Sequence, residues 1–147
     1  MTNKKILFTG GNGFIGRQII PLIERAGYDV VRPRSTQVRL EVDEEVATLF
    51  SDGQHYDAII HAAIVGGRRD VDDDWGVMHT NLNMFETLYK YIDHTDMFIN
   101  LDSGASYGRP APVPEPSPQD FGQVIPGDPY GFSKYIIAKR VLADPKG

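Results

Sequence analysis

The segment that most restricts the fold of this chain is a glycine-rich turn near its start, Thr9-Gly10-Gly11-Asn12-Gly13-Phe14-Ile15-Gly16. A short apolar run, residues 4–9, precedes the turn and is typical of a β-strand. Apolar residues follow it at helical spacing, at Phe14, Ile15, Ile19, Ile20 and Ile23. Glycines between a strand and a helix allow a tight turn, close approach of a ligand to the backbone and close packing of the helix on the strand. The sequence therefore predicts a cradle for the pyrophosphate of a dinucleotide, and its position disfavours the alternative of a purely structural turn.

Extended and helical patterns alternate along the rest of the chain. Strands are predicted at residues 4–9, 28–31, 57–63 and 97–101. Helices are predicted from Phe14 to a stop at Gly27 with Pro21 inside, from the N-cap Asp43 to about residue 50, over 73–91, and from Pro129 behind the N-cap Asp128 through Val141. The proline-rich residues 109–129 are predicted to be a long loop. Because such alternation implies parallel strands with crossover helices, we expect an α/β fold with a Rossmann-type doubly wound parallel sheet.

Composition limits the partners that this chain can have. A net charge of −5 and a pI near 5.3 disfavour nucleic acid and anionic membranes, which attract basic surfaces, and no segment is typical of a membrane span. The chain contains no cysteine, which fits a reducing cytoplasm. Its histidines show no ligand spacing with carboxylates, so we predict no metal site. A chain of 147 residues buries one ordinary core, so we expect one domain and a small-molecule partner.

Two arginines, Arg32 and Arg34, follow the second predicted strand. In dinucleotide-binding folds an acidic residue at this place binds the ribose hydroxyls of NAD, whereas an arginine accommodates the 2'-phosphate of NADP. A guanidinium can bind that phosphate with two hydrogen bonds, and a carboxylate would repel it. We therefore predict NADP as the cofactor, with NAD as the alternative in which both arginines are simply solvated.

A candidate acid–base group combines Tyr130 and Lys134 with Ser103. The tyrosine and the lysine are four residues apart and lie on one face of the last predicted helix. A nearby ammonium favours the ionised phenol, which makes Tyr130 a candidate proton donor or acceptor at a carbinol or ketone oxygen. Ser103 follows the fourth predicted strand, at the carboxyl edge where such sheets bind ligands, and can hydrogen-bond the same oxygen. An exposed amphipathic pair on a helix is the alternative for Tyr130 and Lys134.

These patterns together resemble the amino-terminal part of the extended short-chain dehydrogenase/reductases, a family of nucleotide-sugar epimerases, dehydratases and reductases. The matching residues are spread over nearly the whole chain: Thr9-Gly10-x-x-Gly13-Phe14-Ile15-Gly16, Asp57-x-x-Ile60-His61-x-Ala63, Asn81, Ser103-x-x-x-Tyr107-Gly108, Glu115 and Pro129-Tyr130-Gly131-x-Ser133-Lys134. The resemblance implies that Ser103, Tyr130 and Lys134 are the catalytic triad and that Lys134 also holds the nicotinamide ribose. It implies a cofactor site formed by Gly10, Gly13, Phe14, Ile15, Gly16, Arg32, Arg34, Ala62, Ala63, Tyr130 and Lys134. Asn81 matches a position that supports the active site, although a surface asparagine is the alternative.

The resemblance also bears on the reaction. Dehydratases of this family carry an acidic pair directly after the catalytic hydroxyl residue, where this chain has Gly104 and Ala105, so dehydration is not expected. The arginines at 32 and 34 and the segment Ile64-Val65-Gly66-Gly67 resemble the GDP-fucose synthase branch, which epimerises a 4-keto sugar and reduces it with NADPH. That branch has a cysteine where this chain has Ala105, so the resemblance supports hydride transfer better than epimerisation.

The family further implies a nucleotide-sugar substrate and a homodimer formed through the helices at 73–93 and 130–143. Trp75 is expected to be a core or interface residue. Members of the family continue with a substrate-binding segment, so we expect this chain to be a truncated, amino-terminal portion. A binding module or an inactive fragment that holds the cofactor is therefore the alternative function.

Overall fold

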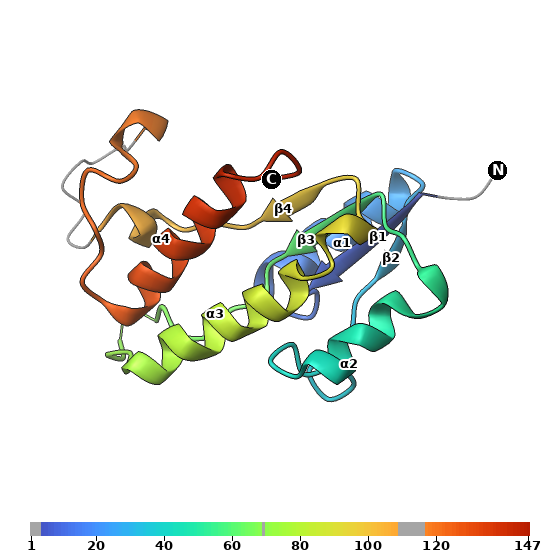
Figure 1. Cartoon of the computed structure of the whole chain (residues 1–147), viewed down its shortest axis with the longest axis horizontal. Coiled ribbons are helices and arrows are strands. Elements are labelled where there is room, and N and C mark those ends of the chain that lie inside the picture. Colours follow the sequence, from blue (N-terminus) through green and yellow to red (C-terminus); the bar gives the residue numbers. More distant parts are fainter. Residues whose placement is uncertain (1–3, 69, 109–116) are drawn as a thin grey trace. The chain divides into compact units, whose positions relative to one another are not determined.

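The structure, a computed structural model, describes residues 4–68, 70–108 and 117–147. Four parallel strands form one sheet in the order β2-β1-β3-β4 (Figure 1). The strands are β1 (Lys5–Thr9), β2 (Asp29–Val31), β3 (Ala58–His61) and β4 (Phe98–Asn100). The α-helices are α1 (Phe14–Arg25), α2 (Asp43–Ala47), α3 (Trp75–Tyr89) and α4 (Pro129–Leu142). The described residues also form short 3-10 helices, which are η1 (Thr48–Gly53), η2 (Ile92–His94), η3 (Gly104–Tyr107) and η4 (Pro118–Asp120). The predicted α/β class with a parallel sheet is thus confirmed.

By its internal contacts the described part of the chain falls into two compact units. The first consists of residues 4–64, 83–101 and 146–147, and the second consists of residues 65–68, 70–82, 102–108 and 117–145. The sheet lies in the first unit, whereas η3, η4 and α4 lie in the second. The prediction of a single dinucleotide-binding domain over residues 1–147 stays a prediction.

The core of the first unit forms around the two inner strands, β1 and β3. Consecutive residues Leu7 and Phe8 of β1 are both fully buried, as expected for a central strand that is covered on its two faces. Phe98 of β4 packs edge-to-face on Phe85 of α3, with ring centroids 5.9 Å apart, and on Tyr89, at 5.0 Å. Burial of each such aromatic side chain stabilises the fold by about 1.5–3 kcal/mol, and these contacts hold β4 and the end of α3 together.

Several helix boundaries differ from the prediction. Val42 is the N-cap of α2 and Asp43 its first helical residue, so the prediction that Asp43 caps this helix is wrong. No side chain caps α2, and its three acidic residues stabilise its amino end through the helix dipole instead. Helix α3 begins at Trp75 and not at 73, and η4 forms within the predicted loop.

The start of α4 is as predicted. Asp128 is the N-cap and its carboxylate accepts a hydrogen bond of 2.8 Å from the Gly131 amide, while Pro129 occupies the first helical position. Helix α1 also continues through Pro21. Within the described residues, no helix is long and apolar enough to cross a bilayer.

Candidate functional site

The amino end of α1 is built to receive an anion. Gly13 is its N-cap, and the Gly13 amide donates a 2.9 Å hydrogen bond to the Gly10 carbonyl, which closes the turn. No side chain caps this helix, and its first turn contains no acidic residue. The amides of the first helical turn and the positive end of the helix dipole are therefore not compensated by the chain's own side chains. This is the arrangement that binds phosphate groups at helix amino ends.

Two of the glycines leave no room for a side chain. Gly10 has a φ of +70°, and a Cβ there would lie 2.6 Å from the amide nitrogen of Ala63. A Cβ on Gly16 would lie 2.5 Å from the Cα of Gly11. The turn is therefore packed backbone against backbone, as close approach to a pyrophosphate requires. The residues present fit the dinucleotide that the fold implies.

The carboxyl ends of β1 and β3 are joined beside this turn. The Thr9 hydroxyl and Nδ1 of His61 are 2.8 Å apart, and both residues are buried. The Ala62 amide donates to the Thr9 carbonyl at 3.2 Å, which places residues 62–63 against Gly10. Of the other residues predicted for the cofactor, Phe14 is 85% exposed at the helix start and Ile15 is also exposed. The structure thus brings Gly10, Gly16, Ala62 and Ala63 together.

Arg32 lies next to the glycine turn as well. A Cβ built on Gly11 would be 3.0 Å from the Arg32 Cβ, which fixes the backbone of Arg32 beside the turn. Arg32 and Arg34 are both exposed. Within the described residues neither side chain forms an ion pair, so both guanidiniums are available to a ligand phosphate.

Ser103 is held at the start of η3, in the second unit. It is the N-cap of this 3-10 helix, and its hydroxyl oxygen accepts a hydrogen bond of 3.2 Å from the Ala105 amide. Because the hydroxyl accepts this bond, its own proton remains available for donation. The side chain therefore has a defined orientation and can donate a hydrogen bond to a substrate oxygen.

Tyr130 and Lys134 lie one turn apart on α4, and both are buried. Tyr130 is 9% exposed and Lys134 is 4% exposed. The alternative of an exposed amphipathic pair is therefore wrong. Burying an ammonium costs free energy unless other groups stabilise it. Lysines are therefore rarely buried for structural reasons alone, and burial of Lys134 points to a functional role.

Helix α4 packs closely against η3. A Cβ on Gly131 would lie 2.7 Å from the Ala105 carbonyl oxygen, so only glycine allows this contact. Gly131 and Lys134 are three residues apart and share a face of α4. The face that carries Lys134 is therefore the one that meets the segment containing Ser103. The second unit thus brings the three predicted catalytic residues onto two elements in direct contact.

Asn81, in the first half of α3, ties α4 to a loop. Its side-chain oxygen accepts from the Val65 amide at 2.9 Å, and its Nδ2 donates to the Val65 carbonyl at 3.0 Å and to the Ser133 hydroxyl at 3.2 Å. The Ser133 hydroxyl in turn donates to the Tyr130 carbonyl at 2.7 Å. Asn81 is fully buried, so the alternative of a surface asparagine is wrong.

The loop that Asn81 holds, residues 65–67 and called the glycine loop below, lies against the Tyr130 ring. A Cβ on Gly67 would be 2.6 Å from two carbons of this ring, and Gly67 has a φ of +78°. The Asp73 carboxylate accepts from the Gly67 amide at 2.9 Å and so fixes the loop. The glycine loop therefore restricts the position of the Tyr130 ring. The sequence gives no separate signal for the roles of Ser133, which is part of the motif around Tyr130, and of Asp73, which precedes the predicted long helix.

The pKa of Lys134 also depends on an acidic residue, Asp102, that the sequence motifs do not mark. Burial lowers the pKa of Lys134 below its ordinary value, and the charge of the Asp102 carboxylate opposes this by raising it. Asp102 directly precedes Ser103, and this position at the end of a strand was the available signal. The combination of a phenol, an ammonium and a hydroxyl is suited to proton transfer at a carbinol or ketone oxygen.

Two further expectations can be compared with the structure. Trp75 is 54% exposed, so the prediction of a core residue is wrong and that of an interface residue stays a prediction; its ring makes an edge contact with Phe132 at 6.4 Å. Glu115, which belongs to the family motif, lies outside the described residues. Within the described part of the chain, no group of three or more potential metal ligands is close enough to hold an ion.

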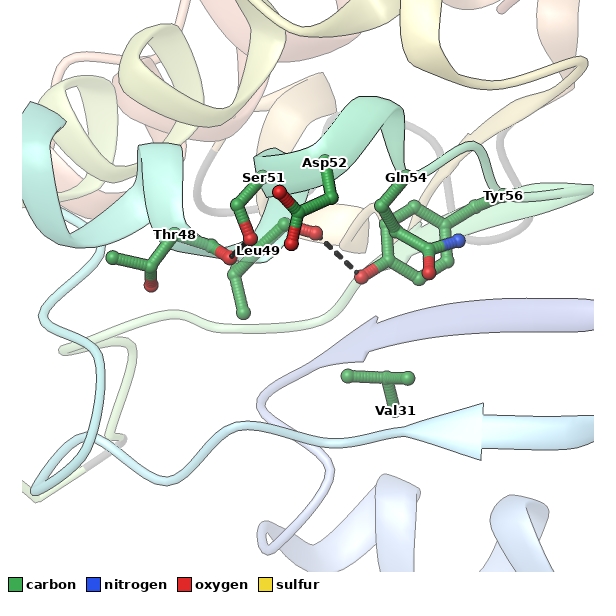
Figure 2. A pocket seen from close by; sticks show the side chains of 7 residues that line it. All are labelled: Val31, Thr48, Leu49, Ser51, Asp52, Gln54 and Tyr56. Carbon is green, nitrogen blue, oxygen red and sulfur yellow. Dashed lines mark hydrogen bonds between the residues drawn. The ribbon is translucent and has the colours of Figure 1, made fainter.

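A pocket of about 340 Å³ lies elsewhere in the first unit, between β2 and η1 (Figure 2). Figure 2 shows Val31 on one side of it and the side chains of η1 and the following residues on the other, where the Tyr56 hydroxyl donates to the Leu49 carbonyl at 2.8 Å. Its lining consists of Val31, Thr48, Leu49, Ser51, Asp52, Gln54 and Tyr56. It contains none of the predicted site residues, and its mixed polar lining points to no ligand.

Comparison with known proteins gives sequence relatives and structural neighbours. The sequence model described as "NAD dependent epimerase/dehydratase family" matches residues 6–143. A putative UDP-glucose 4-epimerase of Methanocaldococcus jannaschii is 30% identical over 152 aligned residues, which cover 89% of this chain and 48% of that protein. A GDP-L-fucose synthase of Azorhizobium caulinodans is 37% identical over 65 residues, which cover 44% of this chain and 20% of that protein. The chain spans about half, or less, of the length of these curated relatives.

Solved structures share the fold. A GDP-6-OMe-4-keto-L-xylo-heptose reductase from C. jejuni superposes with a TM-score of 0.80 at 18% identity, covering 95% of this chain and 42% of that one. A GDP-L-fucose synthetase from Naegleria fowleri bound to NADP superposes with a TM-score of 0.79 at 17% identity, covering 95% and 44%. These likenesses confirm the predicted Rossmann-type fold.

Proposed function

We propose that this chain, which belongs to the NAD-dependent epimerase/dehydratase family, supplies the cofactor-binding and proton-transferring residues of an oxidoreductase or epimerase acting on a nucleotide-linked sugar. The observation that carries the proposal is the pair of buried residues Tyr130 and Lys134, one turn apart on α4, next to the segment that orients Ser103. The named relatives and structural neighbours that act on GDP- or UDP-linked sugars support the substrate class.

In the proposed reaction, Tyr130 moves a proton at the sugar oxygen. For reduction, the phenol donates its proton to a carbonyl oxygen while that carbon receives a hydride, and for oxidation the phenolate takes the hydroxyl proton. A bound nicotinamide would supply or accept the hydride. Lys134 would hold the ribose hydroxyls of the cofactor, while Ser103 donates a hydrogen bond to the same sugar oxygen. Gly104 and Ala105 lack the carboxyl groups that elimination of water would need.

The cofactor of this proposal is NADP, held by the glycine turn. The turn residues Gly10, Gly13 and Gly16 and the first turn of α1, with Phe14 and Ile15, would hold the pyrophosphate, and residues 62–63 would line the groove. Arg32 and Arg34 would bind the 2'-phosphate, because both guanidiniums are exposed and Arg32 adjoins the turn. NAD remains the alternative if both arginines are only solvated.

Replacing Arg32 by serine tests this choice. We expect the affinity for NADPH to fall about tenfold or more, since a charge-assisted hydrogen bond contributes about 1.5–3 kcal/mol, and the affinity for NADH to stay unchanged. Fluorescence titrations of both cofactors measure this, with Arg25→Ser as the control because Arg25 is also exposed but lies at the far end of α1. Preference of the wild-type chain for NADH would contradict the assignment.

The proposed activity is tested by direct assay. The purified chain and the full product of its gene are incubated with NADPH and a GDP-linked 4-keto sugar, and separately with NADP+ or NAD+ and UDP-glucose, while NADPH absorbance and sugar products are followed. We expect NADPH oxidation with the keto sugar, or interconversion of the UDP-sugar, in the full gene product. Cofactor binding without change of either sugar in that product would refute the proposal.

The second candidate is a module that binds the cofactor without turning over a sugar. The observation that favours it is the share of the relatives that the chain spans, 48% of the M. jannaschii protein and 20% of the A. caulinodans protein. Turnover by the 147 residues alone would exclude it. The homodimer through the 73–93 and 130–143 helices and the cytoplasmic location stay predictions.

A further inference from the structure

We propose that Asp102 is a positioning residue for Lys134, with its carboxylate, held by the Ser106 hydroxyl, supplying the negative charge that keeps the buried ammonium protonated and oriented. The inference rests on the proposed role of Lys134 in proton transfer. It adds to that role a fourth side chain, from the same segment as Ser103.

The Asp102 carboxylate is anchored to η3. The Ser106 hydroxyl lies 2.9 Å from Oδ2 of Asp102 and 2.8 Å from the Ser103 carbonyl oxygen, and Ser106 is fully buried. A buried hydroxyl tied to the backbone has few alternative orientations, so it fixes one oxygen of the carboxylate. Asp102 itself is exposed, so the other carboxylate oxygen is not sealed in the protein.

Lys134 meets this segment from α4. Gly131, one turn earlier on the same face of α4, is packed against the Ala105 carbonyl of η3, so this face and the Asp102 segment adjoin. Lys134 is 4% exposed, and a buried ammonium without a counter-charge would lose its proton more easily. Burial lowers the pKa of Lys134. The negative charge of Asp102 raises this pKa, as expected for a carboxylate that stabilises an ammonium.

Other titratable groups lie on the elements around α4. They are Tyr107 on η3, Asp73 at the glycine loop, Asp120 on η4, and Asp128, Tyr130, Tyr135, Lys139 and Arg140 on α4 or at its cap. The charge of Asp102 raises the pKa of Lys134. The short turn at 102–106 therefore orients two functional groups at once, the Ser103 hydroxyl through the Ala105 amide and the Asp102 carboxylate through Ser106.

The test follows the titration of Lys134 itself. The full chain is labelled with ¹³Cε lysine, Lys134 is assigned by its loss in Lys134→Arg, and its chemical shift is followed against pH. We expect Asp102→Asn to move the Lys134 midpoint to lower pH, because removal of a negative charge eases loss of the proton. Asp102→Glu should restore the midpoint towards the wild-type value. Because Asp102 is exposed, about 0.5 M salt should reduce the difference between wild type and Asp102→Asn.

The matched control is Asp96→Asn, which removes an exposed carboxylate of the first unit and should leave the Lys134 midpoint unchanged. A second variant, Ser106→Ala, keeps the negative charge of Asp102 but removes the hydrogen bond that holds its carboxylate. It should move the Lys134 midpoint to lower pH by a smaller amount than Asp102→Asn does. An unchanged midpoint in folded Asp102→Asn, or an equal displacement in Asp96→Asn, would overturn the inference. The titration needs no substrate, so an absence of sugar turnover would count against the proposed function and not against this one.

Discussion

Replacing Tyr130 by phenylalanine is expected to abolish most of the turnover of the full gene product while leaving NADPH binding nearly unchanged. The ring of Tyr130 is buried and packed beside the glycine loop, and phenylalanine keeps that packing while removing the hydroxyl. Proton transfer by a positioned side chain contributes about 10²–10⁴-fold to rate, so kcat should fall by a factor in that range. Steady-state kinetics measure kcat, and a fluorescence titration measures the dissociation constant of NADPH.

Tyr135→Phe is the matched control for this experiment. Tyr135 lies on the same helix and is also buried, but its ring packs on Phe121 with centroids 5.2 Å apart, and its hydroxyl has no part in the proposed reaction. Removal of its hydroxyl should leave kcat within about twofold of wild type, because surrounding packing is retained. Equal activity in Tyr130→Phe and wild type would remove Tyr130 from the mechanism, and equal losses in both tyrosine variants would indicate a structural effect.

Replacing Gly16 by alanine is expected to destabilise the chain and to abolish cofactor binding. In an ordinary helix this substitution stabilises by about 1 kcal/mol, since alanine has the better helix propensity. Here the added Cβ would lie 2.5 Å from the Cα of Gly11, and backbone atoms cannot move aside as a flexible side chain does. Overpacking costs about 1–3 kcal/mol, and the steric term should prevail because the contact is with backbone. The same displacement would open the turn that receives the pyrophosphate.

Urea denaturation and NADPH titration measure the two effects of Gly16→Ala. Gly127→Ala is the control, since a Cβ at Gly127 would meet no atom within 4 Å and its φ is not in the left-handed region. We expect the control to keep wild-type stability to within about 0.5 kcal/mol, as for other substitutions that make no contact. If Gly16→Ala were as stable as the control and still bound NADPH, the glycine turn would not be the cradle.

Much of the fold could be predicted because its signals are local. The glycine turn between an apolar run and a helical pattern marks β1 and α1, and Asp128 with Pro129 marks the start of α4. A cap and its helix are neighbours in sequence, so the pattern contains all the groups that interact. The cap of α2 was predicted one residue too late, at Asp43 instead of Val42, because several acidic residues there satisfy the same local preference.

The environment of the candidate site depends on contacts between distant segments. Asn81 and Ser133 are 52 residues apart, and no local pattern tells whether that asparagine is exposed or buried. Trp75 is the opposite case to the buried Asn81, because this apolar aromatic residue at the start of α3 is about half exposed. Burial is a property of the packed molecule, so periodicity alone leaves it open for single residues.

By itself the sequence determined the parallel α/β architecture, the glycine turn at the start of α1 and the spacing of Tyr130 and Lys134, because backbone geometry and helical periodicity act over a few residues. Only the tertiary structure decided that Tyr130 and Lys134 are buried, that Gly131 brings α4 against η3, and that the charge of Asp102 raises the pKa of Lys134. Burial and contacts of this kind depend on which segments meet in space. The free-energy cost of burying a charge is set by the groups that surround it after folding.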